Sequence, residues 1–126
     1  MKKVLLIEDN PTLSSMYQQK LSQQYEVKVI ADGSQAQDTA ATFQPDLVLL
    51  DLLLPGDING YDILKTLKAR SETQAIQVVI LSSLKPESMP KPEEAILDHL
   101  DKSQTDPQQL LDKVNTYLSQ SSTASN

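Results

Sequence analysis

The apolar run between Pro45 and Pro55 constrains the fold more than any other segment. Its residues 47–50 are four consecutive apolar side chains, which predict a strand buried on both faces, as strands of parallel sheets are. Asp51 follows directly. Because a charge is costly inside such a strand, we expect Asp51 at its C-terminal end, where open α/β sheets place their ligand sites. Taken alone, Asp51 fits equally well a solvated loop residue that only ends the strand.

Strand-like and helix-like segments alternate along the chain. Predicted strands cover residues 4–7, 27–30, 47–50, 76–81 and a short stretch at 99–100. Predicted helices cover residues 12–23, 61–69 and 107–118, and another runs from a cap at Ser34 to about Phe43. The inward face of the first helix is predicted to hold Leu13, Met16, Tyr17 and Leu21. The alternation predicts the α/β class, with a single doubly wound sheet of five parallel strands and helices on both faces.

The composition limits the classes of function. A length of 126 residues suits one domain, and a net charge of −6 argues against non-specific binding to nucleic acids or anionic membranes. The absence of cysteine excludes thiolate metal sites and thiol nucleophiles. No apolar segment approaches the roughly 20 residues that span a bilayer. We therefore expect a cytoplasmic domain over residues 1–119 and a disordered, serine-rich tail over residues 120–126.

Polar residues follow the predicted strands where each one ends. Parallel strands end at one edge of their sheet, so these residues are expected to converge there; they are Glu8, Asp9, Asp51, Ser82 and Lys102. Three adjacent carboxylates would repel one another and raise their own pKa values. A hard divalent cation removes that conflict, and Mg²⁺ suits it because it takes carboxylate oxygens, keeps several waters and bridges to phosphate.

The charges of this predicted pocket suit phosphoryl transfer to Asp51. The acids and Lys102 together carry −2, which Mg²⁺ brings to zero. A phosphoryl group on Asp51 would replace its −1 by roughly −2, and the hydroxyl of Ser82 could donate a hydrogen bond to it. In-line phosphoryl transfer needs positioning and charge neutralisation more than covalent help.

The same residues carry a resemblance to a known family. The matching positions are Glu8-Asp9, Asp51 with Pro55 and Gly60 beyond it, Ser82 and Lys102. Over nearly the whole chain, from Lys3 to about Leu118, this pattern resembles the response-regulator receiver domain of two-component signal transduction. The resemblance implies the flavodoxin-like strand order 2-1-3-4-5. It also implies a phosphorylatable signalling domain that is not an enzyme beyond assisting its own phosphorylation and dephosphorylation.

The resemblance implies a role for each matching residue. Asp51 corresponds to the phosphoacceptor and Asp9 to the direct Mg²⁺ ligand. Glu8 corresponds to a ligand that acts largely through water, and the backbone carbonyl of Leu53 to a further one. Ser82 corresponds to the switch hydroxyl and Lys102 to the phosphate-binding lysine. His99 stands in the place of the switch aromatic.

The implied partners are a histidine kinase or phosphotransfer protein that donates the phosphoryl group, and a downstream protein that responds to it. A weak homodimer is a further implied assembly. Two alternatives stay open: a pseudo-receiver that binds its partner regardless of phosphorylation, and a small phosphatase with an aspartyl nucleophile. Such phosphatases usually need a second acid two residues after the nucleophile, where this chain has Leu53.

The chain departs from the family pattern at four places. The loop of residues 56–59 is one residue longer than usual, and residues 85–92 are rich in proline and lack the usual Gly-Ala turn. His99 stands where Tyr or Phe is common. Ser103 replaces the proline that commonly follows the lysine, so we expect no cis bond there. The last three changes fall on the face that receiver domains typically use for output.

Leu53 and Leu84 lie two residues past Asp51 and Ser82, at positions that flank the phosphoryl group in the family. Both are bulky and apolar, so we predict that they hinder an attacking water and make the phosphorylated form long-lived. A Leu53→Asn, Leu84→Glu double variant should then lose its phosphoryl group faster than the wild type, as followed by intact mass over time. Equal hydrolysis rates would contradict this.

Overall fold

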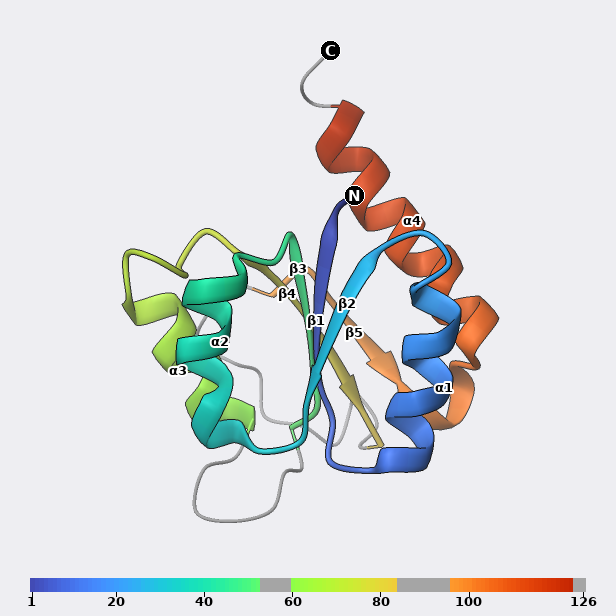
Figure 1. The fold of residues 1–126 in the computed structure, drawn as a ribbon, viewed down its shortest axis with the longest axis horizontal. Coiled ribbons are helices and arrows are strands. Elements are labelled where there is room, and N and C mark those ends of the chain that lie inside the picture. Colours follow the sequence, from blue (N-terminus) through green and yellow to red (C-terminus); the bar gives the residue numbers. More distant parts are fainter. Residues whose placement is uncertain (53–59, 84–95, 124–126) are drawn as a thin grey trace.

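The computed structural model describes residues 1–52, 60–83 and 96–123, the last four of them by their backbone only. Five parallel strands form one sheet in the order β2-β1-β3-β4-β5 (Figure 1). The strands are β1 (Lys3–Ile7), β2 (Glu26–Ile30), β3 (Leu47–Leu50), β4 (Gln77–Ser82) and β5 (Asp98–Asp101). The predicted sheet, its parallel pairing and its order are confirmed.

Among the described residues, two helices cover each face of the sheet (Figure 1). The helices α2 (Ala36–Phe43) and α3 (Gly60–Ala69) lie side by side on one face. On the other face, α1 (Pro11–Leu21) packs beside α4 (Pro107–Thr123). Because the five strands are parallel, their C-terminal ends lie at the same edge of the sheet. Within the described residues, no helix combines the length and the apolar character needed to cross a membrane.

The central strands are buried on both faces, and their residues alternate between two hydrophobic cores. Val4 and Leu6 of β1 pack in the core under α1 and α4, whereas Leu5 and Ile7 pack in the core under α2 and α3. The strand β3 alternates in the same way. This period of two explains why the strands read as continuous apolar runs.

The helix α1 begins at Pro11 and not one residue later, because Asn10 caps it by accepting a hydrogen bond from the backbone N–H of Leu13 at 3.1 Å. Tyr17 and Leu21 are buried as predicted. The prediction that Met16 faces inward is wrong, since Met16 is 47% exposed. The residues at four-residue spacing, Leu13, Tyr17 and Leu21, take the inward side of this helix.

Asp32, and not Ser34, begins the next helical segment. The side chain of Asp32 accepts a hydrogen bond from the backbone N–H of Ser34 at 2.9 Å and caps a short 3-10 helix, η1 (Gly33–Gln35). The helix α2 then follows from Gln35 without a side-chain cap. The predicted cap at Ser34 is therefore wrong, because the stronger acceptor two residues earlier already satisfies the backbone there.

The last helix, α4, runs past its predicted end at Leu118 to Thr123. The backbone of residues 120–123 is helical in the structure, and the disordered tail expected over residues 120–126 stays a prediction. Residues 119–123 contain neither Gly nor Pro, and each residue added to an existing helix gains a backbone hydrogen bond. Figure 1 shows this end of α4 extending beyond the sheet.

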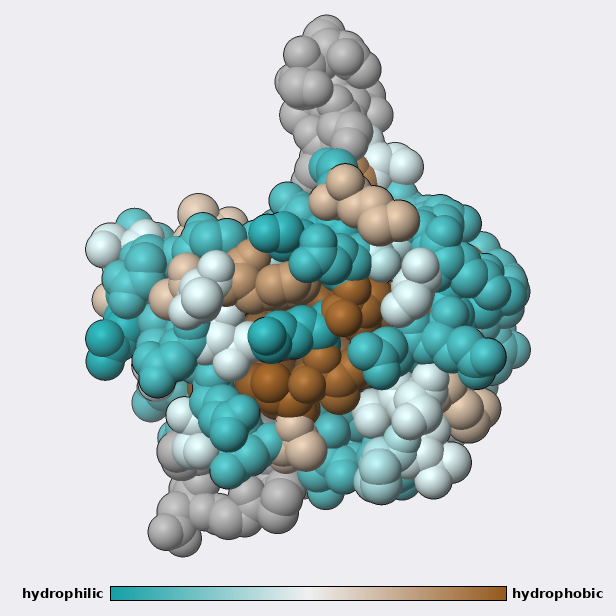
Figure 2. All heavy atoms as spheres, viewed as in Figure 1, coloured by the Kyte–Doolittle hydropathy of each residue, from teal (hydrophilic) through white to brown (hydrophobic). Residues whose placement is uncertain are grey.

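The edge strand β2 is partly apolar on the outside. Figure 2 shows apolar surface in the middle of the view, where β2 crosses the front of the molecule in Figure 1. Val27 and Val29 are only half-buried, and Lys28 between them is exposed. A charged side chain in the middle of an edge strand disfavours pairing with the edge of another molecule.

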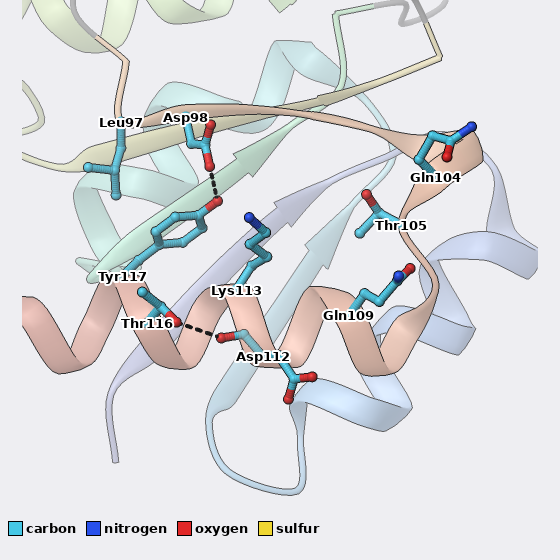
Figure 3. Close-up of a pocket in the computed structure, with 9 residues that line it drawn as sticks. All are labelled: Leu97, Asp98, Gln104, Thr105, Gln109, Asp112, Lys113, Thr116 and Tyr117. Carbon is cyan, nitrogen blue, oxygen red and sulfur yellow. Dashed lines mark hydrogen bonds between the residues drawn. The ribbon is translucent and has the colours of Figure 1, made fainter.

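A partly buried hydrogen bond connects the last helix to the last strand. The hydroxyl of Tyr117 on α4 donates to the carboxylate of Asp98 on β5 (Figure 3). Both residues line a cavity of about 560 Å³ between these elements. Burial, with Asp98 as the second cause, raises the pKa of Tyr117 above the usual tyrosine range.

The raised pKa of Tyr117 predicts a loss of stability in alkali. Below about pH 10, tyrosine is protonated in both the folded and the unfolded chain. Above it the unfolded chain releases a proton that the folded chain retains, so the free energy of unfolding falls as the pH rises. Tyr117→Phe should make this fall less steep in urea titrations between pH 8 and pH 11. The same slope in both proteins would contradict the prediction.

Candidate functional site

Three carboxylates converge at the C-terminal edge of the sheet. Glu8 and Asp9 follow β1, and Asp51 follows β3, the neighbouring strand. The two strands are in register up to the pair Ile7 and Leu50, and the backbone N–H of Asp51 donates to the carbonyl of Ile7 at 3.1 Å. As a result, one carboxylate oxygen from each of the three acids lies within 4.8 Å of the others. The predicted convergence of these acids is confirmed.

The acids differ in their exposure to solvent. Glu8 is 1% exposed and Asp51 is 3% exposed, whereas Asp9 is exposed. Oε2 of Glu8 accepts a hydrogen bond from the backbone N–H of Asn10 at 3.0 Å. Burial raises the pKa of Glu8 by more than Lys102 and the N–H of Asn10 lower it. The cluster therefore has a deep, poorly hydrated side and an open side at Asp9.

Lys102 neutralises the deep side. It begins the 3-10 helix η3 (Lys102–Gln104), directly after β5. Its Nζ donates to Oδ2 of Asp51 at 2.7 Å and forms an ion pair with Oε1 of Glu8. Burial lowers the pKa of Lys102, but the hydrogen bonds to Asp51 and Glu8 outweigh it and raise the pKa overall. The ammonium is thus held charged between the two buried carboxylates.

Ser82 and His99 lie on the two strands beyond Asp51. Ser82 is the last residue of β4, is fully buried and pairs in register with Asp101 of β5. His99 is half-buried on β5 opposite Ile80. Its Nε2 is enclosed and has no hydrogen-bond partner among the described residues. The structure thus brings Ser82 and Lys102 to the predicted edge, while Leu53 and Leu84 lie outside the described residues.

Gly60 packs against the backbone that presents Asp51. The N–H of Gly60, at the start of α3, donates to the carbonyl of Leu52 at 3.1 Å. A Cβ atom at this position would lie 2.4 Å from both the carbonyl oxygen of Asp51 and Cα of Leu52. In the sequence, Gly60 is only one residue of the family pattern. The structure shows why a residue with a side chain does not fit at this position.

The donor set fits a hard divalent cation. Opposite ligands of one Mg²⁺ lie about 4 Å apart, because each oxygen sits about 2.1 Å from the ion. The oxygens of Glu8, Asp9 and Asp51, within 4.8 Å of one another, are close to this spacing. Their three negative charges exceed the single positive charge of Lys102, so a cation would complete the neutralisation.

The family-model comparison matches residues 4–115 to the response regulator receiver domain. The chain belongs to this family. The match covers all five strands and the acid cluster with Lys102, so the resemblance seen in the sequence is confirmed. It places the chain among the phosphorylatable receivers of two-component signal transduction.

Curated relatives share this receiver domain but are longer. The chain is 39% identical over 83 residues to the DNA-binding response regulator MtrA of Mycolicibacterium smegmatis, a match that covers 65% of the chain and 35% of that protein. It is 34% identical over 85 residues to the DNA-binding dual master transcriptional regulator RpaA of Synechocystis, covering 67% of the chain and 35% of that protein. The matched part is thus about a third of each relative's length.

A solved structure links this fold to a metal site. The receiver domain of the sensor histidine kinase PA1611 from Pseudomonas aeruginosa has a magnesium ion coordinated in its active-site cleft. The receiver domain described here matches it with a TM-score of 0.80 and 25% identity, covering 94% of this chain and 98% of that chain.

The close packing of Gly60 predicts that Gly60→Ala disturbs the site as well as the fold. The added methyl group must displace the backbone of Asp51 and Leu52, at a cost of about 1–3 kcal/mol in the free energy of unfolding. Urea denaturation measures this cost, and Lys65→Ala on the exposed side of α3 provides the control. A Gly60→Ala protein as stable as the control would contradict the prediction.

Proposed function

We propose that this receiver domain accepts a phosphoryl group on the carboxylate of Asp51 in a Mg²⁺-dependent reaction. The observation that carries the proposal is the contact of Asp51 with Lys102 inside a cluster of three acids. An aspartate that only ended a strand would need neither a partly buried lysine nor two further carboxylates beside it. The arrangement instead supplies a nucleophile, a cation for the phosphoryl oxygens and a set of metal ligands in one place.

Mg²⁺ would be held by the carboxylates of Glu8, Asp9 and Asp51, with the backbone carbonyl of Leu53, outside the described residues, as a further ligand. When bound, it supplies positive charge that offsets the negative charge on the phosphoryl oxygens. Asp9 supports entry of the ion because it is the exposed member of the cluster. Glu8 is buried and already paired with Lys102, which fits a ligand that acts largely through water.

In the proposed reaction, a carboxylate oxygen of Asp51 attacks the phosphorus of the donor in line with the leaving group. The bond from phosphorus to the donor breaks as the new bond to Asp51 forms, and the leaving group departs with its electron pair. Lys102 already lies within hydrogen-bond distance of Asp51, so a small movement brings its ammonium to a phosphoryl oxygen. Ser82, buried at the end of β4, supplies a hydroxyl as a hydrogen-bond donor on the same edge.

The proposed donor is a phosphohistidine on a histidine kinase or phosphotransfer protein, and the proposed reader is a downstream protein. Phosphorylation replaces the charge of Asp51 by roughly −2. This change shifts Lys102 and Ser82 toward the phosphoryl group. It thereby shifts the equilibrium between two conformations of the surface that binds the downstream protein. On this proposal the domain is a cytoplasmic signalling switch and not an enzyme with its own substrate turnover.

The proposal predicts that Asp51 alone determines phosphorylation. Incubation with Mg²⁺ and a small acyl phosphate should add one phosphoryl group to the wild type, as measured by intact mass. Asp51→Asn should add none, because the amide is a poor nucleophile. Asp46→Asn is the matched control, since Asp46 is an exposed aspartate at the other end of the same strand. Equal phosphorylation of wild type and Asp51→Asn, or unchanged phosphorylation with a chelator present, would refute the proposal.

A further inference from the structure

A buried hydrogen bond joins α1 to the segment that carries Lys102. The hydroxyl of Tyr17 donates to the backbone carbonyl of Thr105 at 2.8 Å, across 88 positions of the sequence. Tyr17 is fully buried and Thr105 is 9% exposed. The helix α1 begins two residues after Asp9, and Thr105 follows Lys102 by three residues. The bond therefore links the helix that follows the acids of β1 to the segment that follows Lys102.

The turn after Lys102 is held by the side chains of its neighbours. Oδ1 of Asp101 accepts hydrogen bonds from the backbone N–H of Ser103 at 2.9 Å and from its hydroxyl at 2.7 Å. The hydroxyl of Thr105 donates to the carbonyl of Asp101 at 2.8 Å, and the N–H of Thr105 donates to the carbonyl of Lys102. Lys102 thus sits in a closed, hydrogen-bonded turn, and its bond to Ser103 is trans as expected.

Tyr17, which lies in the hydrophobic core, holds this turn through its hydrogen bond to Thr105. Figure 3 shows Thr105 on the segment that leads from β5 to α4. Burial raises the pKa of Tyr17, and the charges of Lys102 and Glu8 act on it in opposite directions. The hydroxyl donates to the backbone carbonyl of Thr105 and not to either acid. Its effect on the site has to pass through the backbone of the turn.

We infer that Tyr17 and Asp101 are positioning residues that fix the reach of Lys102 toward Asp51. Asp101 closes the turn and Tyr17 anchors it against α1, so that the ammonium is presented between the buried carboxylates. Ordering the rotamers of the lysine side chain already costs about 2 kcal/mol, and a turn that is held in place spares the contact the further cost of ordering the backbone that carries Lys102. The consequence for phosphoryl transfer rests on the proposed function, whereas the position of Lys102 does not.

Chemical labelling tests whether the ammonium of Lys102 is held in place, and this test does not require phosphorylation. Lysine acetylation by a small amine-reactive ester, resolved by peptide mass spectrometry, reports how often each ammonium is free. Lys102, 14% exposed and paired with two carboxylates, should react slowly. Tyr17→Phe should accelerate its labelling about fivefold, the factor that one ordinary hydrogen bond contributes to an equilibrium. Lys68 is the internal reference, because it is also partly buried and donates to the carbonyls of Gln74 and Ile76.

Three further variants separate positioning of Lys102 from general destabilisation. Tyr25→Phe removes a different tyrosine hydroxyl, which bonds to Asn115 on α4. This variant should leave the labelling of Lys102 unchanged. Asp101→Ala should accelerate that labelling, whereas Asp101→Asn retains an oxygen acceptor and should stay near the wild-type rate. Equal labelling of Lys102 in wild type and Tyr17→Phe would overturn the inference. Parallel acceleration at Lys68 would overturn it as well, because it would indicate loosening of the whole domain.

The rate of phosphorylation by a small acyl phosphate completes the test. At a saturating donor concentration, Tyr17→Phe should be phosphorylated about fivefold more slowly than wild type, and Tyr25→Phe at the wild-type rate. Equal rates in wild type and Tyr17→Phe would overturn the inference for catalysis. A wild type that accepts no phosphoryl group would refute the proposed function, while the labelling of Lys102 would still decide its positioning.

Discussion

The ion pair of Lys102 with Asp51 and Glu8 is the interaction on which the site depends. Two carboxylates that are almost fully buried would be costly at the end of an apolar sheet without a counter-charge. The ammonium supplies this charge and remains protonated because both acids raise its pKa. Removing one partner of such a group leaves an uncompensated buried charge, so the lysine and the acids form one structural unit.

The fold and the placement of the acids follow from local sequence patterns. A parallel strand buried on both faces must be apolar at every position, so residues 47–50 mark β3 without ambiguity. Once the strands are parallel, their ends share one edge, which places Glu8, Asp9 and Asp51 together. The position of Lys102 follows from the same rule, although β5 is short and only one of its four residues, Leu100, is apolar.

Other features depend on contacts that no local pattern encodes. The hydroxyl of Tyr17 finds a partner 88 positions away, and in sequence this residue looks like any other on the inward face of α1. Met16 has the right character for that face, but the geometry of α1 leaves it half-exposed. Asp32 and Ser34 are both good caps, and the choice between them depends on the turn that leaves β2. Patterns therefore predict which edge carries the chemistry, while long-range packing determines how firmly each group is held there.

The same lysine has two roles on the proposed mechanism. In the structure, Lys102 is the counter-ion of Asp51 and Glu8. In the phosphorylated form it would also bind a phosphoryl oxygen, and its three N–H donors are enough for both carboxylates and that oxygen. Glu8, Asp9 and Asp51 would hold a divalent cation, whose positive charge would add to that of Lys102 in offsetting the acids and the phosphoryl oxygens. The hydrogen-bonded turn that follows β5 keeps Lys102 within reach of Asp51 in either role.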